Sequence, residues 1–207
     1  MKTAFRLDYD PDTLAFAVLS IPNMFEQSLL PFIEEERCDC LSKQDPLDQC
    51  MRQCFKKIKD EFKDYDIKEI HDYETHPNRR PKILVQTVGH VAGAAFYYQK
   101  DQLKNVDKKE KLFGVSVHPK YAGWFAFRGV LIFENLKCPG LVQKEPQDVL
   151  ETDEMKYELL RRFNHDWKNW SYRDIITPDT RYSERQKEFF ITPPSQRQEL
   201  VKGYNTK

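Results

Sequence analysis

The sequence predicts an α+β fold in which an antiparallel sheet is flanked by helices, rather than a doubly wound parallel sheet. Predicted strands and helices follow one another irregularly, without the regular strand–helix alternation that a parallel sheet requires. The length, 207 residues, is typical of one domain, so we expect a single domain over residues 1–207. Only 7 residues are glycine, and neither glycine-rich phosphate-binding motif occurs, which disfavours a conventional dinucleotide-binding or P-loop enzyme.

The charge of the chain is balanced, with 33 basic and 33 acidic residues. A general nucleic-acid or anionic-membrane binder would carry a basic excess, so this balance disfavours both classes. The first twenty residues hold two basic and three acidic side chains, and no signal peptide is apparent. The longest uncharged run, residues 83–99, is too short and too polar to span a bilayer. We therefore expect a soluble, cytoplasmic protein.

The N-terminal part predicts two strands and two helices. Residues 14–20 are largely apolar, which is typical of a buried strand, and apolar residues at helical spacing follow over 24–33. Asp45 and Pro46 predict the start of a second helix, because aspartate is a favoured N-cap and proline suits the first turn. An imperfect alternation of apolar and charged residues over 65–73 predicts an amphipathic strand.

The middle of the chain begins with a stiff turn at 76–81, followed by mostly apolar or small residues over 82–99. Helical spacing would stack Gly89 over Gly93, so another element should approach closely there. Two interpretations remain open, which are tight core packing and a groove that accepts a bulky ligand. Residues 100–111 are highly charged and predict a solvated connector.

The C-terminal part predicts a hairpin followed by helices. Apolar runs at 112–117 and 124–133, joined by a turn, predict two antiparallel strands. Apolar positions at helical spacing predict a long amphipathic helix over 151–170. Two short helices are expected at 183–190 and 193–201.

Arg128 lies in the middle of the predicted strand 124–133, whose two faces are both apolar in a strict alternation. A guanidinium cannot lose its charge, and leaving it unpaired in an apolar layer costs several kcal/mol. We therefore expect an anionic partner, either a protein carboxylate or the carboxylate or phosphate of a ligand. Arg173 and Arg197 would complete a site for a small polyanion if they converge with Arg128; otherwise they are solvated surface charges.

Aromatic residues are dense at 96–99 and 167–182, where they suit either the core or a large planar ligand, and composition favours the core. His90 is interpreted as a packing or pocket-wall residue rather than a metal ligand. Two residues earlier, where a carboxylate would orient its imidazole, the sequence has Val88. We find no residue pattern for a catalytic nucleophile, a catalytic acid–base pair or a protein-held metal.

The five cysteines are an odd number, and four of them fall within 17 residues. In a helix, Cys50 and Cys54 would have Cβ atoms about 5–6 Å apart, whereas a disulfide requires about 3.5–4.5 Å, so this pair should stay open. The spacing of Cys38, Cys40, Cys50 and Cys54 is not that of a usual zinc finger. Reduced, partly buried thiols are therefore expected, and Cys138 stands apart from the cluster.

Five segments carry a resemblance to a known family. They are HPNRRPKIL at 76–84, HVAGAA at 90–95, HPKYAGWFA at 118–126 with Arg128-Gly129, WSYRD at 170–174, and RYSE through TPPSQR over 181–197. In this order, within about residues 14–201, the chain resembles the CblC family of cytosolic cobalamin-processing chaperones behind methylmalonic aciduria with homocystinuria type C.

The resemblance implies a flavin-nitroreductase-like α+β fold, with the C-terminal helices of 151–207 closing the ligand site. It implies reductive decyanation of cyanocobalamin and glutathione-dependent dealkylation of alkylcobalamins, with cobalamin bound base-off and no protein ligand to cobalt. Glutathione, possible FAD or FMN, a downstream CblD-type trafficking partner, and a monomer or ligand-dependent homodimer belong to the same expectation. The implied glutathione-binding residues are Arg128, Arg173 and Arg197, and the implied cobalamin-binding residues are Leu84, Tyr97, Gln99, Phe127 and Tyr182.

Two departures from the family pattern affect this interpretation. Phe127 stands where a smaller aliphatic residue is expected, which would tilt or tighten the corrin site. The stretch 38–54 is unusually rich in cysteine, and a cobalamin-dependent thiol oxidase side activity is a further hypothesis. Two alternative functions remain, a flavin-dependent nitroreductase-like oxidoreductase and a non-enzymatic cobalamin carrier.

Overall fold

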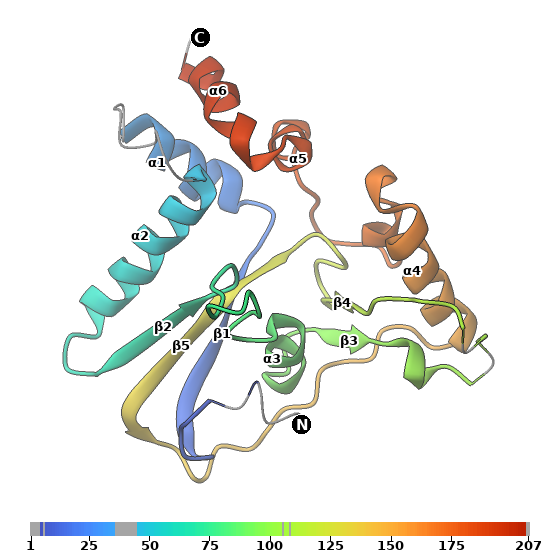
Figure 1. Cartoon of the computed structure of the whole chain (residues 1–207), viewed down its shortest axis with the longest axis horizontal. Helices are drawn as coiled ribbons and strands as arrows, with labels where there is room; N and C mark the ends of the chain where they lie inside the picture. Colours follow the sequence, from blue (N-terminus) through green and yellow to red (C-terminus); the bar gives the residue numbers. More distant parts are fainter. Residues whose placement is uncertain (1–4, 6, 36–44, 105, 108, 206–207) are drawn as a thin grey trace. The chain divides into compact units, whose positions relative to one another are not determined.

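The computed structural model describes residues 5, 7–35, 45–104, 106–107 and 109–205 (Figure 1). Cys38 and Cys40 lie outside the described residues. Antiparallel sheets and helices confirm the predicted α+β class. Contacts group the chain into two compact units, the first from residues 1–20 and 65–180 and the second from residues 21–64 and 181–207.

The first unit contains a three-stranded and a two-stranded antiparallel sheet. In the larger sheet, β5 (Ala126–Lys137) is the central strand, between β1 (Thr13–Ser20) and β2 (Ile67–His71), as Figure 1 shows. In the smaller sheet, β3 (Phe96–Tyr98) pairs with β4 (Val115–Val117). The strands predicted at 14–20 and 65–73 therefore form. The burial predicted for 14–20 is wrong, because β1 is an edge strand in which Ser20 is buried and Phe16 is 50% exposed.

The predicted hairpin between 112–117 and 124–133 is wrong. The intervening turn does form, and His118 pairs with Ala122, which has a φ of 50°. However, this turn leads the chain from one sheet into the other, because β4 pairs with β3 while β5 pairs with β1 and β2. An apolar strand that is buried over most of its length needs a neighbour on each side, and adjacency in sequence does not determine which strands these are.

A β-bulge at Arg128 and Gly129 corrects the predicted faces of β5. Val18 of β1 pairs with Gly129, and the next residue, Leu19, pairs with Phe127. Arg128 therefore has no pairing partner in β1 and is the extra residue of the bulge. Beyond the bulge the alternation is shifted by one position. The clusters that contain Phe127 and Val130 accordingly both pack against Val85. Arg128 therefore lies on the opposite face from Val130, not on the same face as strict alternation predicts.

Helix α3 (Val85–Val91) is shorter than the predicted apolar stretch 82–99, because the chain turns at Gly93, where φ is 71°, and continues into β3. A Cβ at Gly89 would lie 2.0 Å from the Phe127 ring, and one at Gly93 would lie 2.3 Å from the carbonyl oxygen of Lys144. Both glycines therefore serve tight packing, the first of the two interpretations. The short 3₁₀ helix η4 (Lys100–Gln102) follows β3.

The predicted helix 151–170 is correct at its start and too long at its end. Helix α4 (Asp153–His165) is followed by the 3₁₀ helices η5 (Trp167–Asn169) and η6 (Ser171–Asp174). Trp170, between these two short helices, has a φ of 64°, which a continuous right-handed helix does not allow.

The second unit is helical, and its helices were predicted from short sequence patterns. The Asp45 side chain accepts a hydrogen bond from the backbone N–H of Leu47 at 2.9 Å and caps α2 (Pro46–Glu61), as predicted. The predicted helices near 24–33, 183–190 and 193–201 also form. These elements are η2 (Phe25–Leu29, a π-helix), α1 (Leu30–Glu35), α5 (Glu184–Ile191), η7 (Pro194–Gln196), α6 (Arg197–Lys202) and η8 (Gly203–Asn205).

Each unit has its own hydrophobic core. In the first unit, α3 packs against the face of the sheet that carries Phe127, Val130 and Ile132. In the second unit, one cluster of buried side chains joins the helices. Its members are Met24, Phe25, Leu29, Phe32, Ile33, Leu47, Cys50, Met51, Phe189 and Val201.

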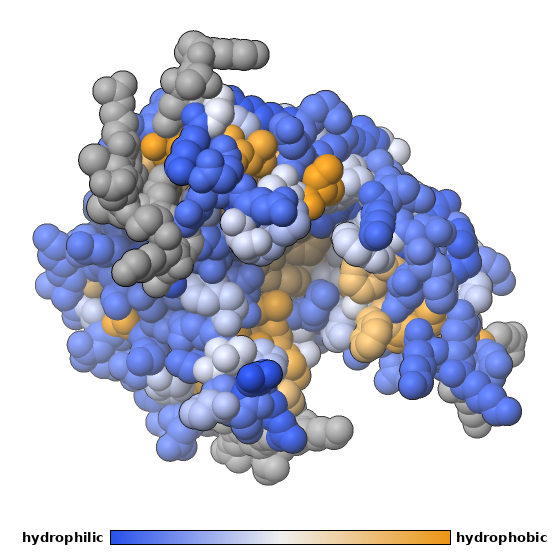
Figure 2. All heavy atoms as spheres, turned by 45° about the horizontal axis from the view of Figure 1, so that its top comes forward, coloured by the Kyte–Doolittle hydropathy of each residue, from blue (hydrophilic) through white to orange (hydrophobic). Residues whose placement is uncertain are grey.

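The surface seen in Figure 2 is mostly hydrophilic, with hydrophobic side chains exposed in separate places. Val142 and Phe113 are the most exposed large apolar residues in the described part of the chain. None of the described helices combines the length and the apolar character needed to cross a bilayer.

Candidate functional site

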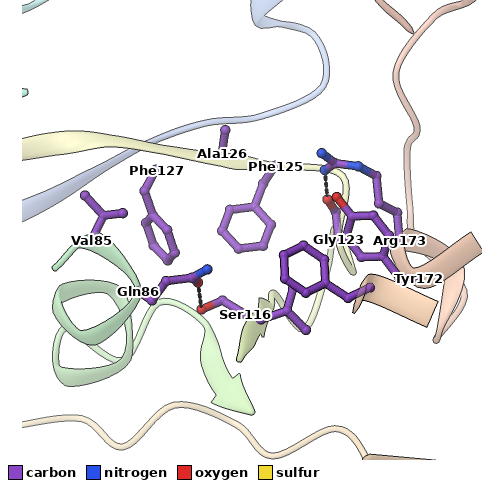
Figure 3. A pocket seen from close by; sticks show the side chains of 11 residues that line it. Val85, Gln86, Ser116, Gly123, Phe125, Ala126, Phe127, Tyr172 and Arg173 are labelled. Carbon is purple, nitrogen blue, oxygen red and sulfur yellow. Dashed lines mark hydrogen bonds between the residues drawn. The ribbon is translucent and has the colours of Figure 1, made fainter. Parts of the chain in front are cut away.

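A cavity of about 230 Å³ lies within the first unit, among α3, β4, the start of β5, α4 and η6 (Figure 3). Its wall is mainly apolar and aromatic, with a few polar side chains, which is typical of sites that bind small molecules. The lining residues are Val85, Gln86, Val115, Ser116, Gly123, Phe125, Ala126, Phe127, Phe163, Tyr172 and Arg173.

The apolar wall is built by the residues that precede the bulge in β5. Phe127 of β5 and Phe125, which directly precedes that strand, point toward α3 and β4 (Figure 3), and their rings meet edge to face at 5.2 Å. Phe127 fits only because Gly89 of α3 has no Cβ. The Phe127 ring therefore has a matching gap on the facing helix.

Two of the polar side chains come from α3 and β4. The buried Ser116 hydroxyl donates a hydrogen bond to the side-chain carbonyl of Gln86, and Figure 3 shows the Gln86 amide pointing into the cavity. Within an apolar wall, such a pair fixes the orientation of the amide and leaves it able to bond a polar ligand group. Neither residue was identified from the sequence, although a single polar residue inside an apolar element is a usable signal.

Arg173 lies at one end of the cavity and is held by a backbone carbonyl and aromatic rings. Its Nη1 donates to the carbonyl oxygen of Gly123, and its guanidinium lies 4.8 Å from the Trp170 ring centroid and 5.1 Å from that of Tyr172. The Trp170 ring is itself stacked on Trp124, with centroids 5.8 Å apart. Cation–π contacts of this kind help to hold a guanidinium in place. Arg173 is therefore not a solvated surface charge.

Arg128 does not line this cavity. It is buried, and its Nε donates to the Ser20 hydroxyl at 2.8 Å. The backbone N–H of Asp72 donates to the Arg128 carbonyl at 3.2 Å. Burial raises the pKa of the Asp72 carboxyl, while the charge of Arg128 acts in the opposite direction. A protein carboxylate is thus close enough to act on Arg128, the first of the two partners that the sequence left open.

Arg197 belongs to the second unit and forms an ion pair there. Its Nη1 donates to the Asp45 carboxylate at 2.6 Å, and both side chains are only 12% exposed. Its Nε donates to the backbone carbonyls of Phe189 and Thr192. Arg197 therefore links the capped start of α2 to the end of α5, and it is not a surface charge. The convergence of the three arginines stays a prediction.

The predicted cobalamin-binding residues differ in their surroundings. Phe127 lines the cavity, and Leu84 directly precedes a lining residue and is 38% exposed. Tyr97 is partly buried in β3, and Gln99 caps the start of η4 from an exposed position. Tyr182, in the second unit, is buried with its ring 5.3 Å from that of Phe190.

Both aromatic-rich segments contribute to the core. Tyr98 is fully buried, and its hydroxyl donates to Asp148 at 2.7 Å and accepts from the backbone N–H of Leu150. Burial and this hydrogen bond raise the pKa of Tyr98 above its usual range. In the second segment Tyr172 and Tyr182 are buried, whereas Trp167 is 56% exposed. The composition-based preference for core is therefore correct for Tyr98, Tyr172 and Tyr182 and wrong for Trp167, while Tyr172 also lines the cavity.

His90 has the packing role that the sequence predicts. Its Nδ1 accepts a hydrogen bond from the backbone N–H of Tyr97 at 3.1 Å, and its ring meets Phe96 edge to face at 5.0 Å. No group of three or more histidine, cysteine, aspartate or glutamate side chains in the described segments could hold a metal ion.

The chain is similar along nearly its whole length to proteins of a known family. The model of the family described as "Methylmalonic aciduria and homocystinuria type C family" matches residues 1–201. Two relatives are named cyanocobalamin reductase / alkylcobalamin dealkylase. The Gallus gallus protein is 48% identical over 97% of this chain and 84% of its own length, and the Homo sapiens protein is 44% identical over 97% and 71%. A crystal structure of a C. elegans B12-trafficking protein, CblC, superposes with a TM-score of 0.89 and 35% identity, covering 100% of this chain and 85% of that one.

Proposed function

Because this chain belongs to the methylmalonic aciduria and homocystinuria type C family, we infer that it processes cobalamin, as a cyanocobalamin reductase and alkylcobalamin dealkylase. The observation that carries this conclusion is similarity along nearly the whole chain to relatives named for these two activities.

The size of the cavity limits how cobalamin would bind. A volume of about 230 Å³ is smaller than the roughly 300–1,000 Å³ of pockets that enclose drug-sized ligands. A corrin ring would therefore lie across the mouth of this cavity, and only a group projecting from one face of the ring would enter it. Contacts to the ring are proposed for Leu84, Tyr97, Gln99, Phe127 and Tyr182.

Cobalamin is proposed to bind base-off, with its own nucleotide base away from the cobalt and no protein side chain in its place. His90 fits this proposal because its Nδ1 is already bonded to the backbone of β3. Loss of the lower donor makes cobalt easier to reduce and the upper ligand easier to remove. For decyanation, a thiol or reduced FAD or FMN would supply one electron, giving Co(II) and releasing cyanide.

For dealkylation, we propose that glutathione thiolate attacks the alkyl carbon. A carbon–sulfur bond forms, the carbon–cobalt bond breaks, and its electron pair remains on cobalt as Co(I). The proposed protein contribution is positioning, together with a higher thiolate fraction beside cationic groups. Arg173 stands at the cavity wall. At Arg128 and Arg197, the carboxylates of glutathione would compete with Asp72 and Asp45.

Further proposals on the fold type, the location and the partner of this chain rest on its family membership. A flavin-nitroreductase-like sheet, closure of the site by residues 151–207 within one functional domain, and a cytoplasmic location are proposed on this basis. Transfer of cobalamin to a CblD-type partner by a monomer or ligand-dependent homodimer is proposed as well. Thiol oxidation with bound cobalamin is a proposed side activity.

Methylcobalamin added to the purified protein is expected to take on the visible spectrum of the base-off form, and added glutathione is then expected to bleach that spectrum. Methylcobalamin with glutathione alone serves as the control. A shift without bleaching would instead support a carrier. No shift, together with a bound yellow flavin, would support a nitroreductase-like oxidoreductase.

Arg128→Ala is expected to slow glutathione-dependent dealkylation about 10–100-fold, because one hydrogen bond to a charged group contributes about 1.5–3 kcal/mol. Cobalamin binding, measured by the same spectral shift, should be unchanged. Arg128→Lys keeps the charge but loses the planar fork and should give an intermediate rate. Arg80→Ala, at an exposed position, is the matched control. Equal loss of binding and dealkylation in Arg128→Ala would show that the role of Arg128 is structural.

A further inference from the structure

The Gln86 side chain lines the cavity and uses only its carbonyl oxygen for hydrogen bonding. That oxygen accepts from the Ser116 hydroxyl, and the amide nitrogen donates to no residue in the described part of the chain. A glutamine amide has two N–H donors. Figure 3 shows this amide pointing into the cavity. The cavity therefore presents an amide donor to which a ligand can supply the acceptor.

The fold fixes the position of this donor before a ligand binds. Gln86 lies in the first turn of α3, and the neighbouring helical residues Val85 and Val88 pack against the larger sheet. Ser116 is 5% exposed and belongs to β4, which pairs with β3. Its hydroxyl holds the amide oxygen, so the nitrogen is directed away from Ser116. A donor held in this way does not have to reorganise during a reaction.

The chemistry of this donor indicates which upper ligand of cobalamin it would recognise. The two reactions proposed for this chain remove cyanide or an alkyl group from cobalt. Cobalt-bound cyanide has a lone pair on its outer nitrogen and accepts a hydrogen bond, whereas a methyl group has no acceptor atom. Cyanide also leaves as an anion, whereas the alkyl group leaves on the sulfur of glutathione. A donor at this place would therefore assist decyanation and not dealkylation.

We propose that Gln86 is a catalytic residue of decyanation, whose Nε2 donates a hydrogen bond to the nitrogen of cobalt-bound cyanide. This role rests on the proposed function, and in particular on entry of the upper ligand into the cavity. One electron from a thiol or reduced flavin reduces Co(III) to Co(II), the cobalt–carbon bond breaks, and cyanide leaves with the bonding electron pair. Negative charge on cyanide grows as this bond breaks, so the hydrogen bond is stronger in the transition state than in bound cyanocobalamin.

The surroundings of Gln86 increase the effect of one hydrogen bond. Phe125 and Phe127 form an apolar wall beside it (Figure 3), and away from water such a contact is electrostatically stronger. Arg173 is the charged residue of the lining, but it comes from η6 and donates to the carbonyl oxygen of Gly123. Its charge favours an anion in the cavity generally, whereas the Gln86 amide would contact one atom of the leaving group.

Gln86→Leu tests this role because it keeps the approximate size and the helix propensity of the side chain but removes the donor. Its kcat for decyanation of cyanocobalamin with glutathione as reductant is expected to fall about 10–100-fold, the effect of losing one hydrogen bond to a charged group. KM should change less, because the bond strengthens in the transition state. Dealkylation of methylcobalamin by the same variant should fall at least about tenfold less. Gln143→Leu, at an exposed position outside the cavity, is the matched control.

Infrared spectroscopy tests the contact without turnover. The C≡N stretching band of cyanocobalamin bound to the full chain responds to a hydrogen bond at nitrogen, so we expect it to shift in Gln86→Leu. Ser116→Ala leaves the amide free to turn, so the band should shift part of the way and decyanation should slow about 2–10-fold. Gln86→Glu, whose ionised carboxylate only accepts hydrogen bonds, should lose at least as much decyanation as Gln86→Leu.

Several results would overturn this role of Gln86. The same C≡N band in Gln86→Leu and in the unchanged protein, or equal losses of decyanation and dealkylation, would show that Gln86 does not contact cyanide. Decyanation retained in Gln86→Glu would show that the amide does not act as a donor. Failure of the proposed function is recognised separately, because the unchanged protein would then neither shift the methylcobalamin spectrum nor release cyanide, and this role would be lost with it.

Discussion

Gly129→Ala is expected to lower the free energy of unfolding by more than about 3 kcal/mol, because it combines backbone strain with a steric clash. Gly129 has a φ of 143°, a conformation that residues with a Cβ rarely adopt. A Cβ there would lie 2.2 Å from the carbonyl oxygen of Ile70. That oxygen belongs to the paired strand β2, so it cannot move away without disturbing the pairing of β2 with β5.

The measurement is a urea titration followed by circular dichroism, in which the midpoint should fall. Gly140→Ala is the matched control because a Cβ at Gly140 meets nothing within 4 Å. Its effect should stay within about 0.5 kcal/mol. Similar midpoints for the two variants would contradict the assignment of the bulge as a site that requires glycine.

Gly89→Ala is expected to disturb the cavity through Phe127. A Cβ at Gly89 would lie 2.0 Å from an atom of the Phe127 ring, so the ring must move or the helix must shift. Overpacking of this kind costs about 1–3 kcal/mol, offset by the gain of up to about 1 kcal/mol that alanine brings to a helix. We expect a net loss of about 1–2 kcal/mol in unfolding free energy and weaker methylcobalamin binding, measured by urea titration and by spectral titration.

Phe127→Leu provides the second arm of this experiment. Alone it should also lower stability, because it removes buried aromatic surface. Combined with Gly89→Ala it should recover part of the loss, because the smaller side chain makes room for the new methyl group. The coupling in such a double-mutant cycle should be about 0.5–3 kcal/mol. Strictly additive losses would mean that Phe127 and Gly89 do not share this space.

Signals confined to a few neighbouring residues predicted the local structure well. The cap at Asp45 was correct because an N-cap bonds within its own first turn. The strand at 14–20 was also correct, but its predicted burial was wrong, because β1 lies at the edge of its sheet and Phe16 is 50% exposed. The same reasoning predicted that Cys50 and Cys54 stay open, since their separation is a property of the helix alone.

Predictions that depended on distant parts of the chain were less successful. The partner of 112–117 was wrong because pairing is decided by the sheet as a whole. The faces of β5 were wrong because one bulge shifts the alternation of every later residue. For the site, Phe127 and Arg173 were predicted and line the cavity, whereas Gln86 and Ser116 were missed.

The sequence alone determined the α+β class and, through five ordered segments, the family and its cobalamin chemistry. Motifs of this kind can be recognised without coordinates because their residues are close together in the sequence. Only the tertiary structure decided which side chains share a cavity and that Asp45 pairs with Arg197. These contacts join residues that are far apart in sequence, and they depend on strand register, a single bulge and the absence of a Cβ at Gly89.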